Sequence, residues 1–192
     1  MILENKNIGI IFLENFYIKD DLLSELNKMS KNNHINIIPI FESEEGEENK
    51  INIYKIGSIL KNKKILCLND ELEDSYTKLF DILILVGFRQ ELLYELNNQI
   101  FDTPVLRLIK LFEKEKIPIV LGLKCNTDIF VIFEQIKRLF NKNKYYFIPI
   151  IFPNPITKPE LITFDPFMIL RTIEYALEKI QIKPIISSNY IS

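Results

Sequence analysis

Short, wholly apolar segments alternate along this chain with longer segments whose apolar residues recur every three or four positions. An apolar run without alternation is typical of a strand buried on both faces, and such strands occur in parallel sheets covered by helices. Residues 82–86 form the most apolar of these runs, so we expect them to be a central strand. The pattern predicts an α/β protein with a mostly parallel sheet of about six strands and helices on both faces.

The same periodicity places the elements along the chain. Asp102 and Pro104 predict a helix start, with Asp102 as the N-cap and Pro104 in the first turn. Gly87 and Gly122 each follow an apolar run and are expected to end a strand, and the prolines between residues 153 and 159 predict an extended segment. We expect strands at residues 8–13, 35–41, 65–68, 82–86, 119–121 and 146–151. We expect helices at residues 20–29, 50–60, 71–80, 91–97, 103–116, 127–140 and 167–180.

Length and charge narrow the class of protein. The 192 residues suit a single domain over residues 1–192, and no repeat or composition break divides them. The formal net charge is −2 without a stripe of Lys and Arg, which argues against nucleic acid as a partner. The longest apolar runs fall well short of the roughly 20 residues of a membrane span. We therefore expect a soluble protein without a membrane partner. The two cysteines, Cys67 and Cys125, lie far apart and lack CxxC spacing, so the expected compartment is the reducing cytoplasm.

Ligands of open α/β sheets bind beyond the carboxyl ends of the strands. That rule selects residues 14–20, 87–92 and 124–128, which follow the first strand, the central strand and the next one. Neither GxGxxG nor GxxxxGK[ST] occurs, so the usual dinucleotide and nucleoside triphosphate sites are not expected. Cys125 lies in the third segment, either as a packing residue or as a reactive thiol. The only histidine, His34, precedes the second strand at the opposite end, and no metal site is expected.

Four stretches of the second half carry a family resemblance. They read FDTPVLRLIK, IPIVLGLKCN, YYFIPIIFPNPITKPE and ILRTIEYALE, the last followed by IKPII, in an order and spacing without obvious gaps. The chain resembles the B subunits of dipicolinate synthases, which are flavoproteins similar to phosphopantothenoylcysteine decarboxylases. The first half fits more loosely, through IGI, DDLLSEL and HINIIPIF.

The resemblance implies a three-layer αβα, Rossmann-like fold of flavoprotein type, with flavin mononucleotide (FMN) as cofactor. It also implies an A-type partner subunit that resembles nicotinamide-dependent oxidoreductases. Together the two subunits would form dipicolinate from a cyclic intermediate of the lysine pathway, in the mother cell during sporulation. A homo-oligomer is implied as well, and the apolar helix at residues 127–140 is a candidate contact.

The loops at the expected ligand edge depart from the family pattern. Relatives carry Thr-Gly-Ser, Pro-x-Thr-Gly-Asn and Ser-Thr-Asn types of loop, where this chain reads Leu-Glu-Asn-Phe, Gly-Phe-Arg-Gln-Glu and Lys-Cys-Asn. Small hydroxyl groups that suit a flavin phosphate are replaced by bulkier or charged side chains, which predicts weak or absent FMN binding. A site rebuilt from the residues present would use Asn15, Gly87, Gln90 and Asn126 toward a cofactor, and Arg89 and Lys124 as clamps for a dicarboxylate.

Three hypotheses of function stay open on the sequence. The first is a B-type subunit of dipicolinate synthase, either catalytic through a rebuilt site or supporting its partner through packing. The second is a stand-alone enzyme of the flavoprotein decarboxylase type, against which the predicted cleft offers no histidine as acid or base. The third is a non-catalytic interaction protein on the same scaffold.

Overall fold

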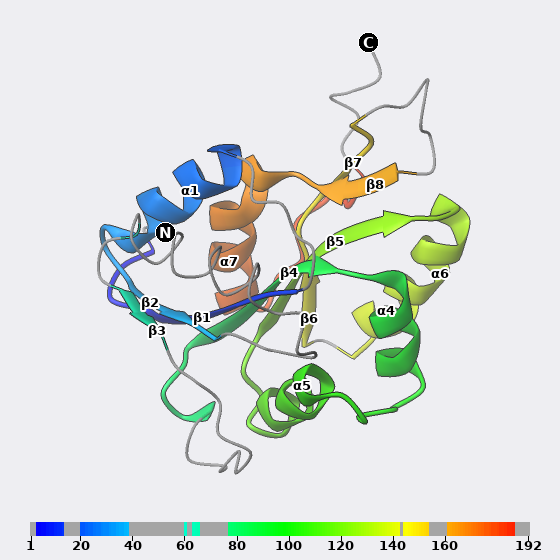
Figure 1. Ribbon diagram of the computed structural model, residues 1–192, viewed down its shortest axis with the longest axis horizontal. Helices are drawn as coiled ribbons and strands as arrows, with labels where there is room; N and C mark the ends of the chain where they lie inside the picture. The colour runs from blue at the N-terminus through cyan, green and yellow to red at the C-terminus, as the bar shows by residue number, and fades with distance from the viewer. Residues whose placement is uncertain are drawn as a thin grey trace, which may run out of the picture.

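A sheet between two layers of helices forms the body of the protein (Figure 1). The computed structural model describes residues 3–13, 20–38, 60, 63–65, 77–142, 144–153 and 161–186. All but the last residue of the predicted helix at 50–60, and most of the one at 71–80, therefore lie outside the described residues. One face of the sheet is covered by α1 (Asp20–Ser30) and α7 (Ile169–Leu177), and the other by α4 (Gln90–Asn97), α5 (Pro104–Lys114) and α6 (Ile129–Phe140).

Six parallel strands of the described part of the chain form the main sheet, in the order β3-β2-β1-β4-β5-β6. From β1 the chain adds β2 and then β3 on one side, and β4 then pairs with the other side of β1. The strand order therefore reverses between β1 and β4, as in Rossmann-type sheets. The prediction of a three-layer fold with a mostly parallel sheet is confirmed. The parallel strands are β1 (Asn7–Phe12), β2 (His34–Ile37), β3 (Lys63–Ile65), β4 (Ile82–Phe88), β5 (Ile119–Asn126) and β6 (Tyr145–Phe147).

The apolar strands supply the core on both faces of the sheet. β4 is buried at every position, as expected for a central strand. Its side chains alternate, so Leu83 and Leu85 pack with α4, α5 and α6, whereas Ile84 packs with α1 and α7. Phe112 of α5 is fully buried, and its ring centroid lies 5.6 Å from that of Phe80.

The prediction that Gly87 and Gly122 end their strands is wrong, because both lie inside longer strands. Gly122 lies in β5, where a Cβ atom would be 3.0 Å from the ring of Phe164. Gly87 has a φ of 83° and lies at a bulge in the pairing with β5, between Val86 and Phe88. Glycine serves close packing at position 122 and a left-handed backbone at position 87.

The region predicted as the last strand, residues 146–151, is divided and is not the last. It forms β6 and the short β7 (Ile150–Ile151), separated at Pro149, which has no N–H to donate to a ladder. A further strand, β8 (Leu161–Phe164), follows and was not predicted. β8 runs antiparallel to the end of β5, and β7 runs antiparallel to β8.

Two helix ends also differ from their predictions. Thr103, not Asp102, is the N-cap of α5, because its side chain accepts a hydrogen bond from the Leu106 N–H at 3.4 Å. At the C-terminal end, the predicted helix at 167–180 is a short 3₁₀ turn, Pro166–Met168, followed by α7. Phe167, predicted on its apolar face, is exposed because it belongs to that turn.

Candidate functional site

A cavity of about 320 Å³ lies at the carboxyl ends of β4 and β5, on the edge where the sequence predicts a ligand. Five of the six predicted site residues line it together, and the sixth, Asn15, lies outside the described residues. Glu91 and Leu161 line it without having been predicted. The lining residues are Gly87, Arg89, Gln90, Glu91, Lys124, Cys125, Asn126 and Leu161.

The bulge at Gly87 decides which side chains reach the cavity. Leu83 and Leu85 face the layer of α4, α5 and α6, so simple alternation would turn Phe88 to the opposite face. The extra residue reverses the alternation, and Phe88 is buried in the same cluster as Leu85. The chain then passes through Arg89 directly into α4, which places the start of that helix at the cavity.

The first turn of α4 forms one wall of the cavity. Arg89 is the N-cap residue, and its side chain makes no hydrogen bond to the helix. It is exposed, and the following Gln90 is half-buried. Because a helix N-terminus carries a partial positive charge, the guanidinium of Arg89 adds to a field that already favours anions.

The end of β5 forms the other wall. Lys124 is half-buried and Asn126 is exposed, while Cys125 between them turns into the core. β8 pairs with this stretch, and its first residue, Leu161, lies opposite Asn126. The antiparallel strand therefore brings an apolar side chain to a cavity that is otherwise mostly polar.

The charges around the cavity suit a small anion. Arg89 and Lys124 bring positive charge from the ends of two neighbouring strands, and Glu91 brings one negative charge. Arginine offers a planar fork that matches a carboxylate, and lysine offers a compact point charge. No histidine lies among the residues that line this cavity, so imidazole acid–base chemistry is not supplied by the part of it that is described.

Cys125 is a packing residue with an unreactive thiol. It is buried, and its Sγ donates a weak hydrogen bond to the carbonyl oxygen of Phe88 at 3.8 Å. The pKa of the thiol is raised to about 12, first by burial and then by the carboxylate of Glu91, while backbone hydrogen bonds from Gln90 and Lys124 act in the opposite direction. Since the thiolate is the nucleophile, the geometry favours the packing role over the reactive one.

We expect the free energy of unfolding to fall more steeply with alkaline pH in the wild type than in Cys125→Ala. The folded thiol holds its proton up to about pH 12, whereas the unfolded thiol loses it near its ordinary pKa of 9.0. The unfolded state then binds fewer protons, so stability decreases as pH rises, by about 1.4 kcal/mol between about pH 8 and pH 10. Urea denaturation of both proteins at the two pH values measures this difference, and equal losses would contradict the raised pKa.

The lining residues do not match a cradle for the phosphate of FMN. In the part of the chain that the structure describes, none of them carries the hydroxyl group of Ser or Thr. Glu91 also places a carboxylate in the first turn of α4, where a phosphate would otherwise bind the helix N-terminus. The described lining therefore offers two cationic side chains of the kind that bind carboxylates, Arg89 and Lys124, and no hydroxyl group for a phosphate.

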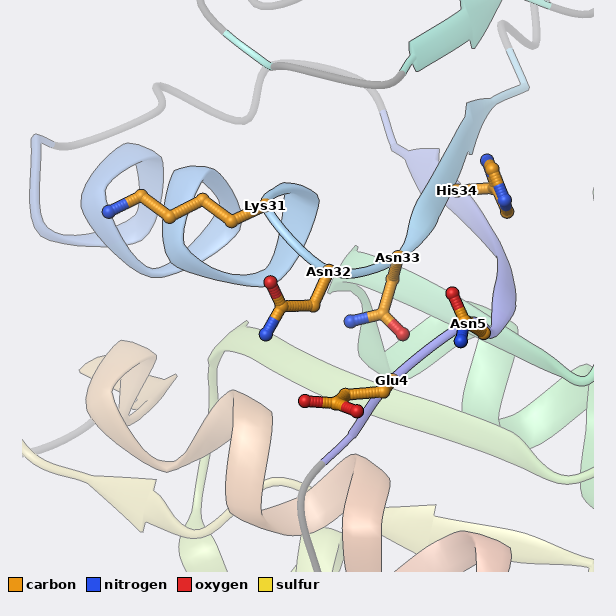
Figure 2. A pocket seen from close by; sticks show the side chains of 6 residues that line it. All are labelled: Glu4, Asn5, Lys31, Asn32, Asn33 and His34. Atoms are coloured by element: carbon orange, nitrogen blue, oxygen red, sulfur yellow. The ribbon is translucent and has the colours of Figure 1, made fainter.

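A second cavity, of about 310 Å³, lies at the amino-terminal edge of the sheet (Figure 2). Its central side chain, Asn33, is buried and fully engaged: its amide donates to the carbonyl oxygens of Leu3 and Met29 and accepts from the Lys6 N–H. Figure 2 shows the exposed His34 at the start of β2, which places this histidine at the edge opposite the site, as predicted. We interpret this cavity as a structural junction between β1 and α1.

Neither a metal site nor a membrane span occurs in the described parts of the chain. Among the residues that the structure describes, no three His, Cys, Asp or Glu side chains come together as a metal site. No described helix has both the length and the apolar character that crossing a bilayer requires.

Comparison with known proteins gives one curated relative and a set of similar structures. No protein-family model matches the chain. The B subunit of dipicolinate synthase from Bacillus subtilis (strain 168) is 28% identical over 110 residues, which cover 57% of this chain and 55% of that protein. The chain is similar to the B subunit of dipicolinate synthase. The matched part spans about half the length of this curated relative.

Solved structures support the fold over nearly the whole chain. The dipicolinate synthase B subunit from Bacillus halodurans superposes with a TM-score of 0.75 at 18% identity, covering 97% of this chain and 98% of that one. A phosphopantothenoylcysteine (PPC) decarboxylase mutant gives a TM-score of 0.59 at 8% identity, covering 91% and 100% of the two chains. A dodecameric FMN-dependent UbiX-like decarboxylase from Escherichia coli O157:H7 gives 0.52 at 12% identity, covering 74% and 79%. The predicted flavoprotein-type fold and the resemblance to the B subunit of dipicolinate synthase are confirmed.

Proposed function

We propose that this chain is a B-type subunit of a dipicolinate synthase, folded as one flavoprotein-like domain over residues 1–192. It acts with an A-type oxidoreductase subunit to form dipicolinate from a cyclic lysine-pathway intermediate, in the cytoplasm of the mother cell during sporulation. The observation that carries the proposal is the cavity at the carboxyl edge of the sheet, which both Arg89 and Lys124 line. The similarity to the B subunit of dipicolinate synthase supports it.

In this proposal the cavity binds a dicarboxylate. Arg89 and Lys124 each hold a carboxylate, and the N-terminus of α4 adds to their attraction. Gly87 lets the backbone approach the ligand, while the amides of Gln90 and Asn126 hydrogen-bond its remaining polar atoms. Asn15, which follows β1 in the sequence and lies outside the described residues, is assigned to the same ligand.

We propose further that this subunit works without FMN, because the described cavity lacks a phosphate cradle. The test is a visible spectrum of the purified chain, followed by titration with FMN under anaerobic and aerobic conditions. We expect no flavin absorbance and no saturable binding at micromolar concentrations. Micromolar or tighter binding would contradict the flavin-free form of the proposal and leave the subunit assignment standing.

The subunit assignment is tested by coexpression with a candidate A-type subunit. We expect dipicolinate to accumulate when both chains are present, and much less when either chain is absent. The Arg89→Ala variant tests the site in the same experiment. Because Arg89 is exposed, we expect the variant to keep its fold, and because it loses the proposed clamp, we expect less dipicolinate. Equal dipicolinate formation with and without this chain would contradict the assignment.

We also propose that the chain assembles with copies of itself. The E. coli relative of the same fold is dodecameric, which supports assembly as a property available to this scaffold. Size-exclusion chromatography with light scattering gives the mass directly, and a single-chain mass at all concentrations would contradict self-assembly.

A further inference from the structure

Glu91 lines the cavity with a charge that the proposed dicarboxylate site does not use. It is exposed in the first turn of α4, where the helix dipole favours a carboxylate. Within the described residues, neither Glu91 nor Arg89 takes part in an ion pair, so both charges are available to a ligand. A carboxylate in this place weakens the binding of a dicarboxylate unless the ligand also carries a positive group to meet it.

The start of α4 is held against the end of β5, which limits where the carboxylate of Glu91 lies. Backbone hydrogen bonds link the sulfur of Cys125 to Gln90 of α4 and to Lys124 of β5. The carboxylate is also near enough to this sulfur to raise the pKa of the thiol. Glu91 therefore lies toward the wall of the cavity that β5 forms, which is the wall that carries Lys124.

The charges of the lining select a pattern of charges in the ligand. The cavity has two positive side chains, Arg89 and Lys124, and one negative side chain, Glu91. A ring with a carboxylate on each side of a protonated nitrogen carries the complementary set of two negative charges and one positive charge. The volume of about 320 Å³ is at the lower end for ligand cavities and suits a single ring of this kind. Leu161 offers an apolar contact to the ring carbons.

We propose that Glu91 is a specificity residue, whose carboxylate accepts a hydrogen bond from the protonated ring nitrogen of a cyclic dicarboxylate. The inference rests on the proposed function and deepens it, because it names the group that tells one cyclic dicarboxylate from another. In dipicolinate the pyridine nitrogen is unprotonated near neutral pH, and its lone pair is repelled by the carboxylate. The site therefore binds a non-aromatic ring with an N–H group more tightly than it binds the aromatic product.

Two ligands of similar size test the proposal by isothermal titration calorimetry. They are dipicolinate and cis-piperidine-2,6-dicarboxylate, whose ring nitrogen is protonated at neutral pH. We expect the wild type to bind the piperidine about tenfold more tightly, because a hydrogen bond to a charged group contributes at least that factor and solvent around Glu91 keeps it at the lower end. In Glu91→Gln the ratio of the two dissociation constants should move toward one.

Glu95→Gln is the matched control, because it removes the same charge from the next turn of α4, outside the cavity lining. It should keep the ratio of the wild type, and an equal change of the ratio in both variants would contradict a contact between Glu91 and the nitrogen. A wild type that binds dipicolinate as tightly as the piperidine, or more tightly, would contradict the role of Glu91 and leave the dicarboxylate site standing. Binding of neither ligand would contradict the dicarboxylate site itself.

Discussion

The double substitution Arg89→Ala/Lys124→Ala is expected to weaken binding of dipicolinate to this chain at least about a hundredfold. Each side chain lines the cavity, and a hydrogen bond to a charged group contributes about 1.5–3 kcal/mol. Since about 1.4 kcal/mol corresponds to a factor of ten in affinity, each single substitution should account for about tenfold or more. Isothermal titration calorimetry with dipicolinate measures the three dissociation constants.

A matched variant separates the cavity from the overall charge of the protein. Arg107→Ala/Lys110→Ala removes the same charge from exposed positions of α5 that do not line the cavity. We expect this variant to bind dipicolinate nearly as the wild type does, because exposed charges that do not line the cavity are screened by salt. An equal loss in both double variants would contradict a specific clamp by Arg89 and Lys124.

The largest effect on stability is expected from Phe112→Ala. The side chain is fully buried between α5 and the sheet, against Phe80, so its removal leaves a void that close-packed neighbours fill only in part. The free energy of unfolding should fall by about 3–5 kcal/mol. Urea denaturation followed by circular dichroism measures this loss.

The companion variant Phe167→Ala removes the same ring from a surface position. Because Phe167 is exposed, the free energy of unfolding should change by no more than about 0.5 kcal/mol. A similar loss in the two variants would contradict the assignment of Phe112, rather than Phe167, to the core.

The sequence predicted the parts of the fold that depend on local apolar pattern. The run at 82–86 is the fully buried centre of β4, and the helix predicted at 91–97 is α4, one residue longer. It did not predict that Gly87 and Gly122 lie inside strands, because both depend on neighbours distant in the chain. The Phe164 ring against Gly122 and the pairing of β4 with β5 around Gly87 are tertiary contacts.

The candidate site was predictable to the extent that it follows from strand topology. Parallel strands end at one edge, so residues after β4 and after β5 had to meet, and Arg89, Gln90, Lys124 and Asn126 do line one cavity. Glu91 adjoins the predicted residues and could have been included by its position in the first helical turn. Leu161 could not, because only the pairing of β8 with β5 brings it there.

Strand β8 has a consequence for the order in which the cavity is built during synthesis. β5 leaves the ribosome before α6 and β6, whereas Leu161 follows both of them along the chain. A nascent chain that stops before β8 can contain all six parallel strands and still lack one wall of the cavity. Binding of a ligand there would therefore distinguish a finished chain from a truncated product that already has the parallel sheet.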